Sequence, residues 1–485
     1  MGLHHRFITV LKSLYHNSYV EVYVNGLKTK KVWIRSGVKQ GCPLSPLLWA
    51  LFICDIGQFL EKSKTGTLIY GVIISALFFV DDLVLIGKTL SEIEKIIKIC
   101  NDQFLLNGLE INCSKSKVLT KEKVQTDHFD LHNYCSTFLR DFELQECYKY
   151  LGIKMNLPLG KPGIYSDQIR YIKNRLNSYK GKILALANNS FDKIKVGCAL
   201  WQNVAIPAIL YGVEILKLKS EDLTKLDSIQ AEFIASLLGV SKSCSHVGLL
   251  KELNWVPISS YIMKMKLKYW VRLCSLPEQS WAKKAWMECS AAINETKGAW
   301  KSDYREEIKN IHDLVKVGHI MKDNMSPTRN VVKAVALYTE DQMESELSLH
   351  KQHSLRYLPD FPTTGIQAYL DGSDSSITLT KFRMGNARLG NRDNPRILIC
   401  PACNNGPNNE LHLAFECKAM SDLRKEPWMA KVLDQASHQK GLDPKDPEKL
   451  KSFLGGDLAS KKVLLERGTY LSILLQKHFE IKQSI

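Results

Sequence analysis

The order of hydrophobic and polar positions predicts strands near the start of the chain. Val20, Val22 and Val24 occupy every second position, and Asn25-Gly26 is a typical two-residue hairpin turn. The segment KKVWIRSG then has the composition of a returning strand. The pattern therefore predicts an antiparallel hairpin.

A second strand pair is predicted between two helices. Residues 46–60 form an apolar stretch of helical length, and residues 75–86 hold two short apolar runs joined by an acidic pair. A capping box of Ser91 and Glu94 then predicts the start of a helix that ends near Gly108. The apolar stripe of that helix consists of Ile93, Ile97, Cys100 and Phe104.

From about residue 165 the hydrophobic period becomes helical. Residues 298–376 are polar and less regular, which favours a connecting helical region, and the charged tail after Lys418 is expected to be helical near its end. The apolar positions at helical spacing include Ile169, Ile172, Leu176, Tyr179, Ile229, Phe233, Leu237 and residues 261–273.

Composition is that of an ordinary globular protein with a basic character. Hydrophobic residues make up 45% and charged residues 24% of 485 residues, which excludes collagen, coiled coil and wholesale disorder. Lys and Arg number 66 against 50 Asp and Glu, so the formal charge is +16 at pH 7. This excess favours a polyanionic partner, either nucleic acid or an acidic membrane surface.

Neither of the two uncharged stretches is expected to cross a membrane. Residues 196–213 contain Gln202, Asn203 and Pro207, and residues 65–80 run directly into the acidic pair. The opening residues MGLHHRFITV lack the pattern of a signal peptide. We therefore expect an intracellular protein with no membrane partner.

Three cysteines and a histidine have the spacing of a zinc site. Cys400, Cys403, His412 and Cys417 form the pattern C-x2-C-x8-H-x4-C, whereas the other cysteines are scattered singly, as buried free thiols are. A C-x2-C turn directs two thiolates at one metal, and His412 with Cys417 would complete a tetrahedral structural Zn²⁺ site. A chance grouping of the four residues is the alternative.

A basic segment, KFRMGNARLGNR at residues 381–392, lies just before this cluster. Its side chains offer phosphate contacts, and Phe382 offers a face on which a base could stack. A solvated basic face is the alternative for each residue. The candidate nucleic-acid-binding residues are Lys381, Arg383, Arg388 and Arg392.

The acidic pair Asp81-Asp82, in the segment LFFVDDLVLIG, is a candidate for catalysis. A polar turn between two strands is the plain alternative. Functionally, such a turn holds two carboxylates at the edge of a sheet, where Mg²⁺ binds oxygen ligands. Two metal ions about 4 Å apart can activate a 3′-hydroxyl and stabilise a leaving pyrophosphate in nucleotidyl transfer.

The acidic pair stands in an ordered series of segments. Gly37 and Gly41 upstream allow close approach of the backbone, in the segment SGVKQGCPLSPLLWALF. The order GVKQGCPLSP, FVDD, GLEINCSKSK and YKYLG resembles motifs B, C, D and E of the reverse transcriptases of non-LTR (LINE-type) retrotransposons. Residues 201–216, 226–240 and 249–258 are similar to the helices after the palm of those elements, and the cysteine-histidine cluster resembles their C-terminal knuckle.

The resemblance implies roles for the matching residues. Asp81 would ligate both catalytic Mg²⁺ ions, Asp82 would support it, and Lys115 is a candidate general acid for pyrophosphate departure. A solvated lysine at position 115 and a core aromatic at position 150 are the alternatives. The implied nucleotide and template residues are Gln40, Gly41, Pro43 and Ser45, and the implied primer grip is Tyr150, Leu151 and Gly152.

The implied carboxylate set is incomplete. A polymerase palm needs a further Asp from a strand that precedes the hairpin. Residues 1–54 contain a single acidic residue, Glu21, and its position fits the solvent face of its strand. Loss of a metal ligand from a two-metal site lowers the rate by orders of magnitude. We therefore expect an N-terminally truncated and inactive polymerase that lacks fingers and the first metal-binding Asp.

The expected fold class is α+β. It comprises a partial palm of antiparallel sheet and helices, then a helical thumb, a helical connector, a small zinc knuckle and a helical tail. The expected partners are an RNA template and a DNA primer, with no obvious protein partner, and the expected location is the nucleus with a cytoplasmic phase. A non-catalytic RNA- or DNA-binding remnant is the second hypothesis, and a group II intron-type maturase fits the knuckle poorly. The expected boundaries are 1–155, 156–297, 298–380, 381–425 and 426–485.

Overall fold

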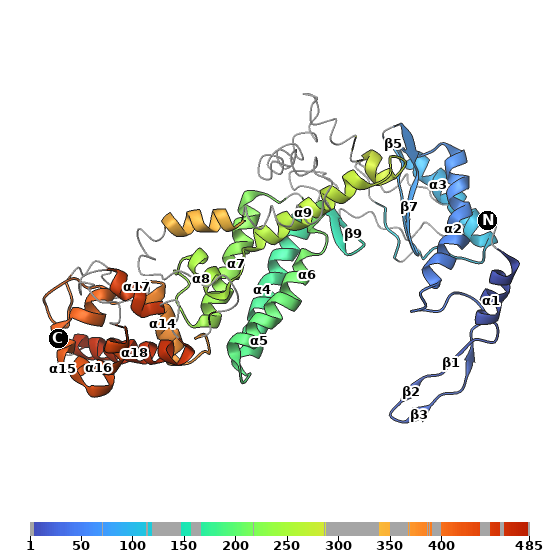
Figure 1. The fold of residues 1–485 in the computed structure, drawn as a ribbon. Helices are drawn as coiled ribbons and strands as arrows, with labels where there is room; N and C mark the ends of the chain where they lie inside the picture. The colour runs from blue at the N-terminus through green and yellow to red at the C-terminus, as the bar shows by residue number, and fades with distance from the viewer. Residues whose placement is uncertain are drawn as a thin grey trace. The chain divides into compact units, whose positions relative to one another are not determined.

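A computed structural model describes most of the chain, which divides into two compact units (Figure 1). The N-terminal unit is Met1–Gln145 and the C-terminal unit is Glu146–Ile485. The described residues are 4–69, 71–112, 115–118, 147–156, 166–216, 218–285, 287, 339–349, 367, 369–385, 387, 389, 399–436, 447–455 and 460–483.

The N-terminal unit combines helices with antiparallel strand pairs, which agrees with the expected α+β class. Its helices are α1 (His5–Tyr15), α2 (Ser45–Ser63) and α3 (Leu90–Leu106). Its strand pairs are β1 (Tyr19–Val20) with β4 (Val32–Trp33), β2 (Tyr23–Val24) with β3 (Leu27–Lys28), β5 (Thr67–Ile69) with β6 (Val72–Ile74), and β7 (Ala76–Phe79) with β8 (Asp82–Leu85).

The predicted turn Asn25-Gly26 connects β2 and β3. Asn25 and Gly26 have φ values of 50° and 79°, the left-handed pair that a two-residue hairpin turn of this kind requires. The Glu21 carboxylate lies 2.7 Å from the Lys28 ammonium across the hairpin. Glu21 lies between β1 and β2 rather than within a strand, and its side chain is only 12% exposed, so the predicted solvent-facing strand position is corrected: the carboxylate is partnered by Lys28.

The core of the N-terminal unit lies between α2, α3 and the hairpin β7–β8. Ala76 and Phe78 face this core because side chains alternate along a strand, whereas Leu77 and Phe79 on the opposite face are exposed. The buried helical residues are Ile53, Ile56, Leu60, Ile96, Cys100 and Phe104. The hairpin with the acidic pair is thus held on one face by two helices.

The N-cap of helix α3 is Thr89, two residues before the predicted N-cap Ser91. The Thr89 hydroxyl accepts the backbone N–H of Glu92, and the Glu92 carboxylate accepts the N–H of Lys88. The sequence offers two overlapping S/T-x-x-E patterns, Thr89 with Glu92 and Ser91 with Glu94, and the first caps the helix.

The C-terminal unit is largely helical. Residues 281–285 and 339–349 are also helical. The named elements are β9 (Cys147–Tyr150), β10 (Ile153–Asn156), α4 (Ser166–Asn188), α5 (Lys193–Leu200), η4 (Trp201–Ala205), α6 (Ile206–Leu210), η5 (Val213–Ile215), α7 (Ser220–Leu238), α8 (His246–Leu253), α9 (Ile258–Ser275), α14 (Asp374–Arg383), η6 (His412–Glu416), η7 (Lys418–Met420), α15 (Ser421–Lys425), α16 (Pro427–Ala436), α17 (Pro447–Gly455) and α18 (Lys461–Gln483).

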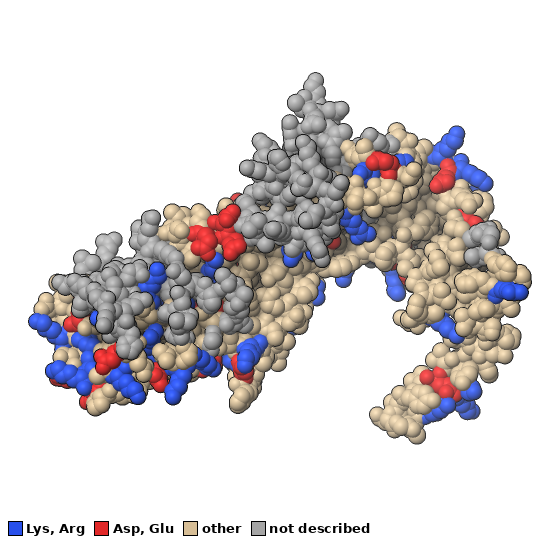
Figure 2. Space-filling view, in the orientation of Figure 1, with Lys and Arg blue, Asp and Glu red and all other residues tan. Residues whose placement is uncertain are grey.

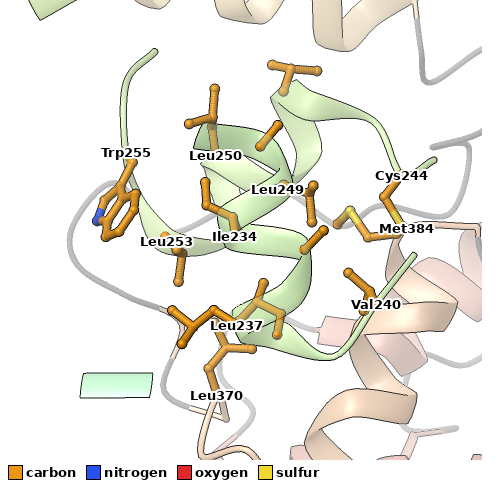
Figure 3. Packing of buried hydrophobic residues seen from close by; sticks show 14 of the residues in the cluster. Ile234, Leu237, Val240, Cys244, Leu249, Leu250, Leu253, Trp255, Leu370 and Met384 are labelled. Atoms are coloured by element: carbon orange, nitrogen blue, oxygen red, sulfur yellow. The ribbon is translucent and has the colours of Figure 1, made fainter. Parts of the chain in front are cut away.

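One apolar core runs through the C-terminal unit. Ile234 and Leu237 of α7 pack with Leu249 and Leu253 of α8, and Met384 after α14 joins the same cluster (Figure 3). The Trp201 and Phe233 rings stack within it at a centroid distance of 4.0 Å. Because α14, α17 and α18 contribute to this core, the C-terminal helices are continuous with the helices that precede them.

The division of the chain differs from the predicted boundaries. The pair β9–β10 belongs to the C-terminal unit, although the sequence assigned residues up to 155 to the palm. The predicted boundary at 380/381 falls inside α14. Residues 298–338 of the predicted connector lie outside the described residues.

The surface of the described residues carries charges of both signs (Figure 2). None of the described helices has the length and apolarity needed to cross a bilayer. On the face shown in Figure 2, Lys and Arg side chains lie over the C-terminal helices with Asp and Glu side chains between them. The net positive charge of the sequence is therefore mixed with acidic groups on this face.

Candidate functional site

The acidic pair lies at the tip of the hairpin β7–β8. Phe79 pairs with Asp82 in the register, so Val80 and Asp81 form the two-residue turn. Both aspartates are exposed, as a ligand for a metal or a substrate must be. Val80 has a φ of 55°, a conformation that costs a β-branched residue about 1–3 kcal/mol and that surrounding contacts must hold.

Helix α2 supplies a contact that holds this turn. The indole N–H of Trp49 donates to the carbonyl oxygen of Val80 at 2.5 Å. Trp49 also packs against the core beneath the hairpin. The strained turn is therefore fixed from below by a rigid helix, while its carboxylates stay in solvent.

The predicted nucleotide loop leads directly into the same helix. Gly41 has a φ of 83°, and the buried Ser45 hydroxyl donates to the Lys39 carbonyl at 2.6 Å, which closes the loop. Gln40, Gly41 and Pro43 are exposed. Ser45 precedes Trp49 by one helical turn, about 6 Å along the axis, so the loop and the acidic turn are anchored to one end of α2.

Lys115 belongs to a separate turn of the N-terminal unit. Its backbone N–H donates to the carbonyl and side-chain oxygens of Asn112, at 3.3 Å and 3.2 Å, and its side chain is exposed. Among the described residues, no hydrogen bond or ion pair joins Lys115 to Asp81 or Asp82. Its role as a general acid stays a prediction.

The predicted primer grip is the turn of the hairpin β9–β10. Leu151 and Gly152 have φ values of 45° and 85°, so a tight turn exposes the peptide groups of this tip. The Tyr211 hydroxyl donates to the Leu151 carbonyl at 2.8 Å, and the Tyr211 ring lies against Gly152, where an added Cβ would be 2.9 Å from it. Tyr150 belongs to β9 and has its own partner.

The structure brings the four predicted zinc ligands together. One ligand atom from each of Cys400, Cys403, His412 and Cys417 lies within 4.8 Å of all the others. The Cys400 and Cys417 sulfurs are 3.8 Å apart, and the Cys403 sulfur is 3.3 Å from His412 Nε2. Tetrahedral Zn²⁺ with Zn–S bonds of about 2.3 Å requires sulfurs about 3.8 Å apart, so the arrangement fits the ion.

The local fold orients the histidine of this cluster. Its Nδ1 lies 3.5 Å from the Glu416 carboxylate, which leaves Nε2 facing Cys403. Gly406 lies so close to the imidazole that an added Cβ would be 2.6 Å from Cε1. A carboxylate on the far nitrogen of a metal-binding histidine fixes its orientation and raises its basicity.

Two thiols of the cluster shift each other's pKa. The neighbouring Cys417 thiol lowers the pKa of Cys400 well below its usual range, with further contributions from His478 and from the backbone N–H groups of Cys403 and Ala402. Cys400 in turn raises the pKa of Cys417. Zn²⁺ binding would deprotonate both thiols, because cysteine binds a metal as the thiolate.

Two residues of the basic segment, Phe382 and Arg383, are buried rather than exposed as the sequence predicted. Arg383 is 2% exposed and its Nε lies 2.6 Å from a Glu252 oxygen, so its guanidinium is unavailable to a phosphate. Phe382 is fully buried and offers no face for a base. Lys381 is half-buried, and Arg388 and Arg392 lie outside the described residues. The prediction for Arg383 and Phe382 is therefore corrected.

Three contributing residues carried signals of unequal strength in the sequence. Glu416 follows His412 by four positions, which is a helical neighbour that could have been found. Trp49 and Tyr211 reach turns that are 31 and 60 residues away along the chain. Such tertiary contacts leave no local pattern.

The exposed acidic turn and the glycine loop lie within a segment like those of polymerases. Residues 3–155 match the family model described as reverse transcriptase (RNA-dependent DNA polymerase). This segment of the chain is therefore similar to reverse transcriptases.

Similar proteins identify the kind of reverse transcriptase that the chain resembles. It is 27% identical over 191 residues to the transposon TX1 uncharacterized 149 kDa protein of Xenopus laevis, covering 37% of this chain and 14% of that protein. It is also similar to Pol polyproteins of type-1 retrotransposable element R2. The Popillia japonica protein is 25% identical over 33% of this chain and 27% of its own length, and the Nasonia vitripennis protein is 35% identical over 30% and 14%.

These similarities are partial in length. The matched segments span 14% to 27% of these curated relatives. The chain resembles the reverse transcriptases of non-LTR retrotransposons, as the sequence motifs indicated.

Proposed function

We propose that this chain binds an RNA template with a DNA primer, and that Asp81 and Asp82 are Mg²⁺ ligands of an incomplete nucleotidyl-transfer site. The observation that carries the proposal is the exposed carboxylate pair on a strained turn fixed by Trp49. A turn held in this way presents both carboxylates with little loss of freedom on binding a metal. Mg²⁺ would supply charge stabilisation for the attacking and leaving oxygens.

The glycine loop before α2 and the turn of the hairpin β9–β10 have roles in the same proposal. Gln40, Gly41 and Pro43 would lie against the nucleotide and template base, with the buried Ser45 closing their loop. Tyr150, Leu151 and Gly152 would grip the primer strand, and Lys115 would protonate the leaving pyrophosphate. In this proposal, residues 1–155 form a partial palm, residues 156–297 a helical thumb, and the zinc knuckle lies within residues 381–425.

We propose further that Cys400, Cys403, His412 and Cys417 hold a structural Zn²⁺. Three of these side chains are almost completely buried, and Cys403 is half-buried, so no position is left open for a substrate. A closed site of this kind stabilises the fold around it.

The location in the nucleus with a cytoplasmic phase is part of the proposal, and a fluorescent fusion of the chain would test it.

Primer extension tests the catalytic part. The full chain is incubated with a heteropolymeric RNA template, a DNA primer, deoxynucleotides and Mg²⁺, and duplex binding is measured in parallel by fluorescence anisotropy. We expect retention of the duplex without incorporation, because the acidic residue available in residues 1–54 is Glu21, which pairs with Lys28. Asp81→Asn should weaken the Mg²⁺-dependent part of duplex binding.

Asp55→Asn is the matched control, because Asp55 is an exposed carboxylate of α2 outside the acidic turn. Incorporation that disappears in Asp81→Asn and persists in Asp55→Asn would show an active polymerase and overturn the expected inactivity. A chain that neither retains the duplex nor incorporates nucleotide would contradict the whole proposal.

The second candidate is a binding protein without any metal-dependent step. The ion pair that occupies Glu21 and the mixed charge of the C-terminal surface favour it. Duplex retention that is identical with Mg²⁺, with EDTA and in Asp81→Asn would support this candidate over the first.

A further inference from the structure

Helix α4 carries basic side chains with two kinds of partner. Three of these side chains form ion pairs with carboxylates, and two of the carboxylates belong to α7, so those pairs tie the two helices together. The charge of each paired residue is balanced within the fold. The three ion pairs are Arg170 with Asp167, Lys173 with Asp222 at 2.5 Å, and Lys180 with Glu232 at 2.6 Å.

Arg175 on the same helix has aromatic partners instead. Its Nη2 donates to the Tyr179 hydroxyl at 3.2 Å, and its guanidinium carbon lies 5.7 Å from the centre of the Tyr171 ring and 5.6 Å from that of the Tyr179 ring. Among the described residues, no carboxylate pairs with Arg175. An aromatic ring attracts a cation through its quadrupole and does not neutralise it. The guanidinium is therefore held in place with its positive charge intact.

The hairpin β9–β10 brings a second cation to one of these rings. The Lys154 ammonium of β10 lies 5.1 Å from the centre of the Tyr171 ring. The backbone N–H of Lys154 donates to the side-chain oxygen of Gln168 in α4 at 2.9 Å. Strand and helix are thus joined through the backbone as well as through side chains, and both cations lie against the same tyrosine.

A third cation lies directly opposite Lys154 in the hairpin. Lys149 of β9 is its partner in the antiparallel register, so the two side chains leave the same face of the strand pair. Neither ammonium has a carboxylate partner in the part of the chain that the structure describes. Like charges directly opposite each other destabilise a strand pair. Their juxtaposition indicates an anionic ligand that binds between or across them.

The arrangement of these cations favours an extended polyanion over a single anion. Lys149, Lys154 and Arg175 follow one another from β9 to β10 to α4, and Lys149 is exposed while the other two are half-buried. A nucleic-acid backbone presents phosphates in such a succession, and basic side chains that contact it release counterions. Because the cations form one succession, they match the backbone of one strand.

We propose that Lys149, Lys154 and Arg175 bind the phosphate backbone of a single RNA strand, and that Tyr171 and Tyr179 hold the cations in place. This inference rests on the proposed RNA binding and names the surface that performs it. Phosphate contacts carry no sequence information, so the surface accepts any base sequence. The ion-paired side chains of α4 take no part in this binding.

Salt dependence of RNA binding by the full chain tests the proposal. A labelled single-stranded oligouridylate is titrated by fluorescence anisotropy at several salt concentrations, and thermal unfolding checks that each variant is folded. Lys154→Gln and Arg175→Gln each remove one cation, and Arg175→Lys keeps the charge. Arg170→Gln is the matched control, because it removes a charge from an exposed side chain of α4 that already has a carboxylate partner.

We expect Lys154→Gln and Arg175→Gln each to lower the slope of log K against log salt by about 0.7, the contribution of one phosphate contact to a single strand. The double variant should lower it by about twice as much. Arg175→Lys and Arg170→Gln should keep the slope of the unaltered chain. An RNA of mixed sequence should give the same changes, since the bases are not contacted.

The outcomes separate this surface from RNA binding as such. If the unaltered chain binds the oligouridylate and both Gln variants match it in slope and affinity, the surface is not the binding site, although RNA binding stands. An equal loss in Arg170→Gln and Arg175→Gln would show a general effect of charge and overturn the proposal. Losses confined to an RNA duplex would overturn the single-strand assignment. If the unaltered chain binds neither RNA nor the primed duplex, this inference and the proposed function both fail.

Discussion

Removal of Arg383 is expected to destabilise the C-terminal unit and to leave nucleic-acid binding unchanged. The side chains of Arg383 and Glu252 are 2% and 0% exposed, and one Nε–Oε1 distance of 2.6 Å joins them. Arg383→Met would leave the Glu252 carboxylate buried without its charged partner, while the Tyr369 hydroxyl would still donate to it at 2.9 Å. Breaking a buried pair from one side costs about 3–5 kcal/mol.

The double variant Glu252→Met with Arg383→Met tests whether the loss of unfolding free energy comes from an unpaired buried charge. It removes both charges at once, so its cost should be smaller than that of either single variant. Unfolding of the full chain in urea, with hydrogen exchange of α8 and α14 read by mass spectrometry, localises the effect. Both helices should lose protection in the single variants.

Salt dependence of RNA binding distinguishes this role from a phosphate contact. A lost phosphate contact lowers the slope of log K against log salt by about 0.7–0.9. We expect an unchanged slope in Arg383→Met, measured below its unfolding midpoint. Lys381→Met is the matched control: it removes one positive charge from the same helix, but at a half-buried side chain rather than a fully buried one. Normal stability together with a reduced slope in Arg383→Met would refute the reasoning.

Three further perturbations test other parts of the molecule. Tyr211→Phe removes the donor to the Leu151 carbonyl, a loss of about 0.5–1.5 kcal/mol, and should weaken binding of a recessed primer end in anisotropy measurements more than binding of blunt duplex. Burial lowers the pKa of Lys266 from 10.5 to about 8, so the unfolded chain binds more protons between these values and stability should rise with pH there. Lys266→Met should flatten that rise in urea unfolding, and an unchanged pH profile would contradict the assignment. Gly406→Ala, with φ at 105° and a Cβ that would meet the His412 ring, should release zinc in chelator competition, whereas Gly181→Ala in the open middle of α4 should not.

Local signals predicted much of the fold and of the candidate site. The Asn25-Gly26 turn and the two apolar runs joined by the acidic pair were sufficient to predict both hairpins, because turns depend on nearby residues. The second turn is formed by Val80 and Asp81 rather than by Asp81-Asp82. The spacing of Cys400, Cys403, His412 and Cys417 was sufficient for the cluster, since a short loop can bring all four together. The first residue of α3 could not be fixed from the sequence, because two capping patterns overlap at its N-terminus.

Long-range partners could not be predicted from one sequence. Arg383 is 131 residues from Glu252, and nothing around it distinguishes a buried guanidinium from a solvated one. The same limit hid Tyr470 of α18, whose hydroxyl donates to the Ala414 carbonyl in η6, 56 residues away along the chain. A basic residue takes its role from what folds against it, which explains why the binding assignment failed there and why the Lys381 assignment stays a prediction.

The Glu252–Arg383 pair joins segments that lie on either side of residues 288–338. Cutting the backbone within that interval would leave the two pieces bound to each other, since they share one apolar core and a charge pair that neither piece can satisfy alone. A nicked chain would then run as two bands in detergent and as one species in native buffer. Separately expressed halves would need each other to become soluble.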